Sequence, residues 1–146
     1  MAPRISRRIA EFVDALPLAD GMRVLEIGCG PGVAAREVAR RIGNGHVVAI
    51  DRSAKAVGQA TAGSAELIEA GVLSFRRTAI DEFELEPGED AFDLAFAMRV
   101  GALDGRHPEA GREAMTRIRS ALRPHGRLYV DGGSPLKQIP LPPRHE

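Results

Sequence analysis

Three glycines at alternate positions stand where a run of apolar residues gives way to a helical pattern. Gly28, Gly30 and Gly32 follow the strand-like stretch 23–27, and the helical stretch 33–42 comes next. Glycines at such a turn let the backbone bend sharply and come close to a ligand that side chains would exclude. The helix would direct its free N–H groups at the same place. The turn therefore predicts a binding site for an anionic or zwitterionic ligand.

An acidic residue follows on the next apolar run. Asp51 comes directly after the stretch 46–50, which reads as a second strand. A carboxylate at the tip of that strand can accept hydrogen bonds from both hydroxyls of a ribose. Asp51 has a second possible role, as a cap for the helix that starts near Ser53. Its place after the glycine turn favours a ribose-bearing cofactor.

The spacing of the glycines separates two classes of cofactor. A dinucleotide-binding turn has the pattern G-x-G-x-x-G, and here Val33 stands where its third glycine would be. The run from Glu26 to Gly32 instead resembles the E/D-x-G-x-G-x-G motif of class I S-adenosylmethionine-dependent methyltransferases, at every fixed position. The resemblance implies that Glu26 and the backbone at Gly28 hold the methionine end of S-adenosylmethionine, and that Asp51 holds its ribose.

The second half of the chain resembles the same family. The stretch 92–97 is similar to the family's fourth strand, and 118–128 is similar to the turn before its fifth strand, with His125 where glycine is usual. The resemblance covers roughly residues 10–133. Its specificity is concentrated in the glycine motif.

The adenine end of the cofactor has a weaker signature. In many relatives the third strand ends in an acid that reaches the adenine amino group, but the aligned position here is Ala79. The resemblance implies that backbone groups near Ala79 and Ile80, with apolar packing, hold the adenine. Asp81 is either a substitute for the missing acid or an ordinary loop or cap carboxylate, and both roles stay open. The predicted cofactor-binding residues are Glu26, Gly28, Cys29, Gly30, Gly32, Asp51, Arg52, Ala79 and Ile80.

The acceptor of the methyl group should bind near the stretch 98–107, because substrates bind at the carboxyl ends of the strands in open α/β sheets. Arg99 would orient a carboxylate or phosphate of the acceptor, unless it forms an ordinary surface ion pair. His107 is the predicted catalytic base, with capping of the helix at Pro108 as its alternative role. An Asn/Asp-Pro-Pro-aromatic sequence does not follow the fourth strand, which disfavours a base amine of DNA as acceptor.

The elements that must position these residues alternate along the chain. Alternating helices and strands predict an α/β fold with a doubly wound, mainly parallel sheet of about five strands and helices on both faces. Within the third helix, Gly58 and Gly63 weaken the helical pattern. The expected strands are 23–27, 47–51, 73–78, 92–98 and 127–131, and the expected helices are 3–15, 33–42, 53–70 and 108–122.

The chain is expected to form a single domain over residues 1–146, with a core at 10–133 and a proline-rich tail at 134–146. In the family, a helix and an antiparallel hairpin usually follow the fifth strand. The tail is too short and too rich in proline for both. The sheet would therefore have an open edge, which a homodimer, a partner chain or the tail itself would cover.

Composition excludes several classes of function. Twenty basic and twenty acidic residues balance, so we expect no nucleic-acid partner, and no stretch approaches the ~20 apolar residues of a membrane span. We expect a cytoplasmic protein. The lone cysteine, Cys29, is either a reactive thiol or, as we favour, a small residue at a variable motif position. The four histidines lack metal-ligand spacing, so no metal site is expected.

Three functions fit parts of this pattern. The favoured function is an S-adenosylmethionine-dependent methyltransferase that acts on a small-molecule acceptor. The alternative is a methyltransferase-like cofactor-binding module or subunit without catalysis of its own, which the short tail and the missing adenine acid favour. A nicotinamide-dependent oxidoreductase is disfavoured by Val33 and by the lack of a Tyr-x-x-x-Lys pair.

Overall fold

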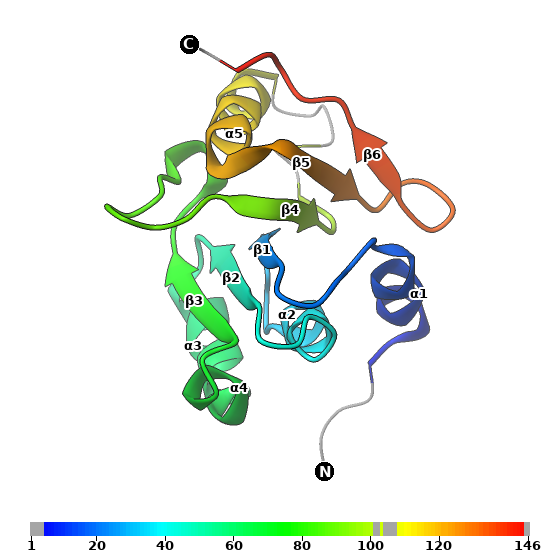
Figure 1. Cartoon of the computed structure of the whole chain (residues 1–146), viewed down its shortest axis with the longest axis vertical. Coiled ribbons are helices and arrows are strands. Elements are labelled where there is room, and N and C mark those ends of the chain that lie inside the picture. The colour runs from blue at the N-terminus through cyan, green and yellow to red at the C-terminus, as the bar shows by residue number, and fades with distance from the viewer. Residues whose placement is uncertain (1–4, 101–102, 104–107, 145–146) are drawn as a thin grey trace.

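One mainly parallel sheet runs through the described part of the chain, which is residues 5–100, 103 and 108–144 of this computed structural model. Its strand order is β3-β2-β1-β4-β5-β6 (Figure 1). Neighbouring strands from β3 to β5 are parallel, and β6 is antiparallel to β5. The strands are β1 (Arg23–Ile27), β2 (His46–Asp51), β3 (Leu73–Arg77), β4 (Phe92–Ala97), β5 (Leu122–Val130) and β6 (Lys137–Ile139).

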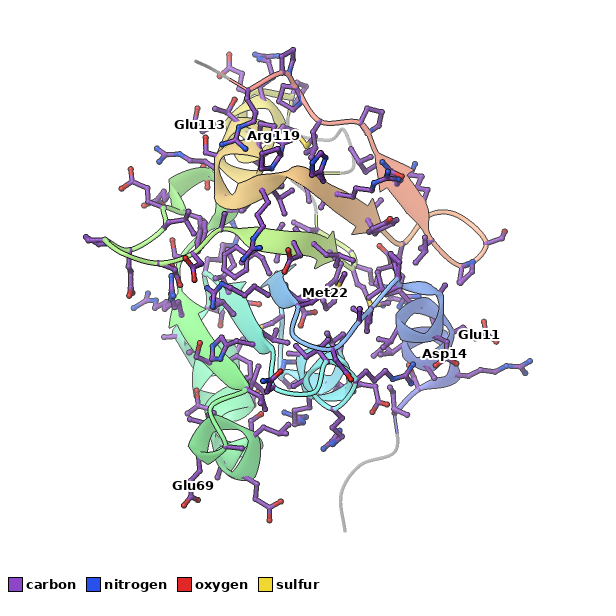
Figure 2. All side chains as sticks on the ribbon, viewed as in Figure 1. Glu11, Asp14, Met22, Glu69, Glu113 and Arg119 are labelled. Carbon is purple, nitrogen blue, oxygen red and sulfur yellow. The ribbon has the colours of Figure 1, made fainter. Side chains whose placement is uncertain are left out.

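Helices cover both faces of the sheet. α1 and α2 pack on one face, and α5 with the short helix η1 packs on the other (Figure 1). In Figure 2, Glu11 on α1 and Glu113 on α5 mark these two sides of the molecule. The predicted α/β fold is confirmed. The helices are α1 (Arg7–Ala15), α2 (Val33–Ala39), α3 (Ala54–Ala62), α4 (Ala65–Glu69), η1 (Ile80–Glu82) and α5 (Pro108–Ala121).

The central strands are apolar on both sides because both of their faces are buried. In β1, Val24 faces the layer of α1 and α2, whereas Leu25 and Ile27 face α5. All three side chains are at most 2% exposed. Because the strands from β1 to β5 run in the same direction, their carboxyl ends meet at one edge of the sheet, where the loops with the predicted functional residues begin.

Three predicted helices and one predicted strand are wrong in extent. α1 begins at Arg7, after its N-cap Ser6, and not at residue 3. β5 begins at Leu122, directly after α5, and not at residue 127.

The stretch 53–70 forms two helices, because the chain turns at Gly63 and the Ser64 side chain goes inward, where its Oγ accepts a hydrogen bond from Arg36. α2 ends at Ala39, one turn earlier than expected, and the chain then turns up to Gly43. Gly43 has a φ of +57°, a left-handed conformation that glycine adopts without strain.

The tail supplies a sixth strand, one more than the expected number of about five. Lys137 pairs with Val130 and Ile139 pairs with Leu128, in antiparallel register. Of the three ways to cover the edge of β5, the tail itself is therefore the one observed. Pro135 and Pro140 lie just outside β6, where the missing N–H of proline breaks no ladder hydrogen bond.

Candidate functional site

The turn between β1 and α2 is held against the end of β2 by its backbone. The N–H groups of Gly28 and Cys29 both donate to the carbonyl of Ile50, at 2.8 Å and 3.0 Å. Gly28, Gly30 and Gly32 have φ values of +70°, +54° and +88°, which other residues adopt only at a cost. This is the sharp turn that the glycine spacing predicts.

The three glycines have different surroundings. A Cβ added at Gly28 would lie 2.7 Å from Cγ2 of Val100, and one at Gly32 would lie 3.0 Å from Arg36 and 3.2 Å from Phe75. A Cβ at Gly30 would meet nothing within 4 Å. Gly28 and Gly32 therefore let the protein pack closely against the turn, whereas Gly30 borders open space where a ligand can approach the backbone.

Asp51 ties the end of β2 to this turn. Its Oδ2 accepts from the Gly30 N–H at 2.9 Å, and its Oδ1 accepts from the Ser53 N–H at 2.9 Å. The cap of α3 is Ser53, whose Oγ accepts from the Ala56 N–H. Each carboxylate oxygen can accept a second hydrogen bond, so Asp51 keeps acceptor capacity for two hydroxyl groups beside Gly30.

Glu26 is a buried carboxyl group at the end of β1. Its side chain is 3% exposed, and its Oε1 has no hydrogen-bond partner within the described residues. Burial, followed by the negative charge of Asp51, raises the pKa of Glu26 to about 8. A buried carboxyl oxygen without a partner is costly, and an added donor or cation would relieve that cost. Glu26 thus has the properties needed to meet an ammonium group.

Arg36 on α2 is a site residue that the sequence analysis missed. Its Nη1 donates to the carbonyl of Pro31 at 2.9 Å and to Oγ of Ser64 at 3.1 Å. The guanidinium thereby joins the glycine turn to the break between α3 and α4. Its position one helical turn after Gly32 was a signal for this role, because residues i and i+4 share a helix face.

The remaining predicted cofactor-binding residues differ in character. Cys29 is buried, which raises the pKa of its thiol to about 12 and keeps it protonated, so the reactive-thiol interpretation loses its basis. Arg52 is exposed beside Asp51. Ala79 precedes η1 in an extended conformation, and the side chain of Ile80 is buried against the α5 layer. Because its side chain is buried, Ile80 can offer a ligand only its backbone groups. Asp81 is half-buried.

The loops after β4 and β5 meet through Asp131. Its Oδ1 accepts from the backbone N–H of Arg99 at 2.9 Å, and its Oδ2 pairs with the guanidinium of Arg8 from α1. Arg99 has a φ of +57°, and such strain in a residue other than glycine is concentrated at functional sites. The predicted base, His107, lies outside the described residues. Neither Arg8 nor Asp131 was singled out from the sequence.

A large cavity, of about 1220 Å³, lies between α1 and the segment 131–135. Met98 at the end of β4 also lines it, and so do Glu11 and Asp14, which Figure 2 labels on α1. Its charged side chains are neutralised by partners, which limits their attraction for a charged ligand. The ion pairs are Arg7–Glu11, Arg8–Asp131 and Arg41–Asp14.

Metal ligands and membrane-spanning helices are both missing from the part of the chain that the structure describes. Its residues bring together no group of three or more histidine, cysteine, aspartate or glutamate side chains that could hold a metal ion. None of the helices among these residues has the length and apolar character that crossing a membrane requires.

Sequence comparison places residues 18–144 within a family described as "methyltransferase domain". The ubiquinone biosynthesis O-methyltransferase of Hahella chejuensis is 37% identical over 93 residues, which are 62% of this chain and 36% of that protein. The protein-L-isoaspartate O-methyltransferase of Methylorubrum extorquens is 35% identical over 133 residues, which are 91% of this chain and 51% of that protein. The chain spans about half the length of the curated relatives it matches.

Solved structures show the same fold. The [4+2]-cyclase SpnF is 28% identical with a TM-score of 0.69, over 84% of this chain and 43% of that one. A methyltransferase from Thiobacillus denitrificans, in complex with S-adenosylhomocysteine, is 24% identical with a TM-score of 0.67, over 86% of this chain and 48% of that one. The Rossmann-like methyltransferase fold is thereby confirmed.

Proposed function

This chain belongs to the methyltransferase domain family, and we propose that it binds S-adenosylmethionine at the glycine turn and transfers the methyl group to a small-molecule acceptor. One observation carries the proposal. The backbone of Gly30 borders open space, and the carboxylate that holds it, Asp51, keeps acceptor capacity for the two ribose hydroxyls.

The residues around the turn fit the parts of this cofactor. The ribose would lie against Asp51, with Arg52 beside it. The methionine ammonium would meet the unpartnered oxygen of Glu26. The backbone near Gly28 and Cys29 would also contact the ammonium. The adenine would use backbone groups at Ala79 and Ile80.

Chemistry at this site needs little from the chain beyond alignment. When bound, S-adenosylmethionine supplies a methyl group activated by a sulfonium, and the protein must hold the acceptor in line with it. The acceptor would lie at the carboxyl ends of β4 and β5, near Met98, Arg99 and Asp131. His107 stays our proposal for the base that takes a proton from an oxygen or nitrogen acceptor.

One experiment tests the activity. The protein is incubated with S-adenosylmethionine that carries a labelled methyl group and with a panel of small alcohols, phenols, amines and carboxylic acids. We expect label in at least one acceptor together with an equal amount of S-adenosylhomocysteine, and no transfer by Asp51→Ala. If the imidazole is the base, His107→Gln should lower the rate and remove the rise in rate that a histidine base produces around pH 6.5.

A second candidate function is a cofactor-binding module or subunit without catalysis of its own. One finding favours it: a protein of the same fold, SpnF, is named as a cyclase rather than a methyltransferase, so this fold is not always tied to methyl transfer. Binding of S-adenosylmethionine without transfer to any member of the panel would support this candidate over the first.

Location and assembly remain predictions. We propose a cytoplasmic protein without a nucleic-acid partner, which cell fractionation and a binding assay with duplex DNA and RNA would test. A homodimer would use the outer edge of β6, where Lys137 and Gln138 are exposed. Light scattering at two protein concentrations distinguishes a monomer from that dimer.

A further inference from the structure

A second, smaller cavity lies at the carboxyl ends of β4 and β5, beside the amino end of the neighbouring antiparallel strand β6. Its volume is about 310 Å³. Its apolar lining includes Ala97, Val100 and Val130, and its charged lining is Arg99, Asp131 and Lys137. We call this the β4–β6 cavity. The tail contributes to it directly, because Lys137 pairs with Val130 in the β5–β6 ladder.

The charges of the β4–β6 cavity do not cancel as those of the larger cavity do. The charge of Asp131 is already balanced by the guanidinium of Arg8, and its other oxygen accepts from the backbone N–H of Arg99. Within the described residues, neither the Arg99 guanidinium nor the Lys137 ammonium pairs with a carboxylate. Two cationic groups therefore line the cavity without a counterion from this part of the chain.

The β4–β6 cavity is also next to the glycine turn. Val100 lines it, and the same side chain lies so close to Gly28 that a Cβ there would be 2.7 Å from Cγ2 of Val100. One valine side chain thus separates the cavity from the turn. A small molecule in the cavity would have its reacting end within a short reach of a cofactor at Gly28.

We propose that the β4–β6 cavity binds the anionic group, a carboxylate or a phosphate, of the methyl acceptor. This inference rests on the proposed function, because it takes the glycine turn as the methyl-donor site. Arg99 offers a planar guanidinium that can bind two anionic oxygens at once, and Lys137 adds a point charge from β6. The apolar side chains Ala97, Val100 and Val130 would contact the carbon skeleton that carries the anionic group.

The test uses simple probes and the full chain. Benzoate, phenyl phosphate and neutral benzamide are titrated into the ¹⁵N-labelled protein, with and without S-adenosylhomocysteine, and amide shifts are followed by NMR. We expect saturable shifts at 97–100 and 130–137 with at least one anion, and none with benzamide. Preference for benzoate would identify a carboxylate acceptor, and preference for phenyl phosphate a phosphate acceptor.

Variants assign the effect to the two cations. Lys137→Met and Arg99→Asn should each weaken anion binding at least about fivefold, since each removes one charged hydrogen-bond donor. Asparagine is chosen at Arg99 because it tolerates the left-handed backbone. The control is Lys55→Met, which removes the same charge from an exposed position on α3 and should leave anion binding unchanged.

Separate outcomes overturn the two proposals. Equal shifts with benzamide, no saturable shift with either anion, or the same weakening in Lys55→Met would contradict an anion site. If S-adenosylhomocysteine binds in these samples, the proposed function survives that failure. If the anions bind but neither S-adenosylhomocysteine nor S-adenosylmethionine does, the acceptor role falls together with the proposed function.

Discussion

The two halves of the sheet edge are held together by different kinds of contact. On the side of β1 and β2, the N–H groups of Gly28 and Cys29 share the carbonyl of Ile50, a contact between backbone groups, to which the carboxylate of Asp51 adds a hydrogen bond from the Gly30 N–H. On the side of β4 and β5, the loops meet through side chains, with Asp131 as the common acceptor.

This difference bears on what each half can do. Backbone contacts between neighbouring strands depend little on residue type. The β1–β2 side, which we call the donor half because the methyl donor is proposed to bind there, therefore keeps one shape that would suit one cofactor. The β4–β5 side, which we call the acceptor half because the methyl acceptor is proposed to bind there, depends on a few side chains from α1, β6 and the loop after β5, which can change without disturbing the turn. A constant donor site beside a variable acceptor site suits a family that methylates many acceptors.

The largest expected effect is that of Asp51→Ala on the donor half. Removing the carboxylate deprives the ribose of two charge-assisted hydrogen bonds, so we expect the affinity for S-adenosylmethionine to fall at least about 100-fold. The Gly30 and Ser53 N–H groups also lose their acceptor, which should lower the free energy of unfolding. Calorimetric titration and chemical denaturation measure the two effects.

Asp93→Ala is the matched control for that variant. Asp93 accepts the backbone N–H of Arg23 at 2.8 Å, near the amino ends of β1 and β4, so its loss should destabilise the fold without touching the cofactor site. If Asp93→Ala weakens cofactor binding as much as Asp51→Ala does, the loss of affinity in Asp51→Ala is due to lower stability alone. The assignment of the ribose to Asp51 would then be wrong.

The second effect concerns the contact between the two halves, where Val100 lies against Gly28. Gly28→Ala would place a methyl group against Val100 and would strain a backbone with a φ of +70°, so we expect cofactor affinity to fall about tenfold. Val100→Ala should restore part of that loss in the double variant, because it removes the clash but not the strain. Independent effects of the two substitutions in a double-mutant cycle would refute a contact between the halves at this point.

The third effect is the pH dependence due to Glu26. Its folded pKa of about 8 is above the ordinary value of 4.5, so its contribution to stability is complete below pH 4.5 and is lost as pH rises through about 8. A bound ammonium favours the ionised carboxylate, so the affinity for S-adenosylmethionine should rise with pH up to about 8, with proton release on binding.

Glu26→Gln is the comparison for this pH effect. The amide does not titrate, so the variant should lose both the pH dependence of stability assigned to Glu26 and the proton release. Titrations in two buffers of different ionisation enthalpy count the released protons. The same proton release by the wild type and by Glu26→Gln would show that the ammonium binds elsewhere.

The smallest expected effect belongs to the acceptor half. Arg8→Met breaks a partly exposed ion pair with Asp131, and such pairs contribute about 1 kcal/mol or less. We expect a small decrease in melting temperature and a cofactor affinity within about twofold of the wild type, since the glycine turn has its own backbone contacts. A large loss of cofactor affinity would show that the halves are not independent.

Local patterns were enough to predict the strand and the turn of the donor half. The bounds of β1 agree with the prediction at both ends, because an apolar run that stops at a glycine turn leaves little choice of where the strand lies in the sequence. The glycine spacing also gave the turn and the cofactor class. The hydrogen bond from Gly30 to Asp51 was not visible in advance, because it depends on how β1 and β2 align in space.

The acceptor half depends on contacts between distant segments, and there sequence patterns were less informative. The pairing of Arg8 with Asp131 spans 123 positions, and neither residue belongs to a recognisable motif. The short strand β6 lies between prolines, which argued against a helix and a hairpin but could not show that three residues pair with β5. The helical pattern of 53–70 likewise gave no sign that Ser64 would turn inward to Arg36.

The central claim is that the glycine turn is a site for S-adenosylmethionine. The most direct measurement is a calorimetric titration of the purified protein with S-adenosylmethionine, S-adenosylhomocysteine and NAD. We predict that the two sulfur-containing ligands bind with one site per chain and that NAD does not bind. Binding of NAD, or no binding of either sulfur-containing ligand, would contradict this account of the site.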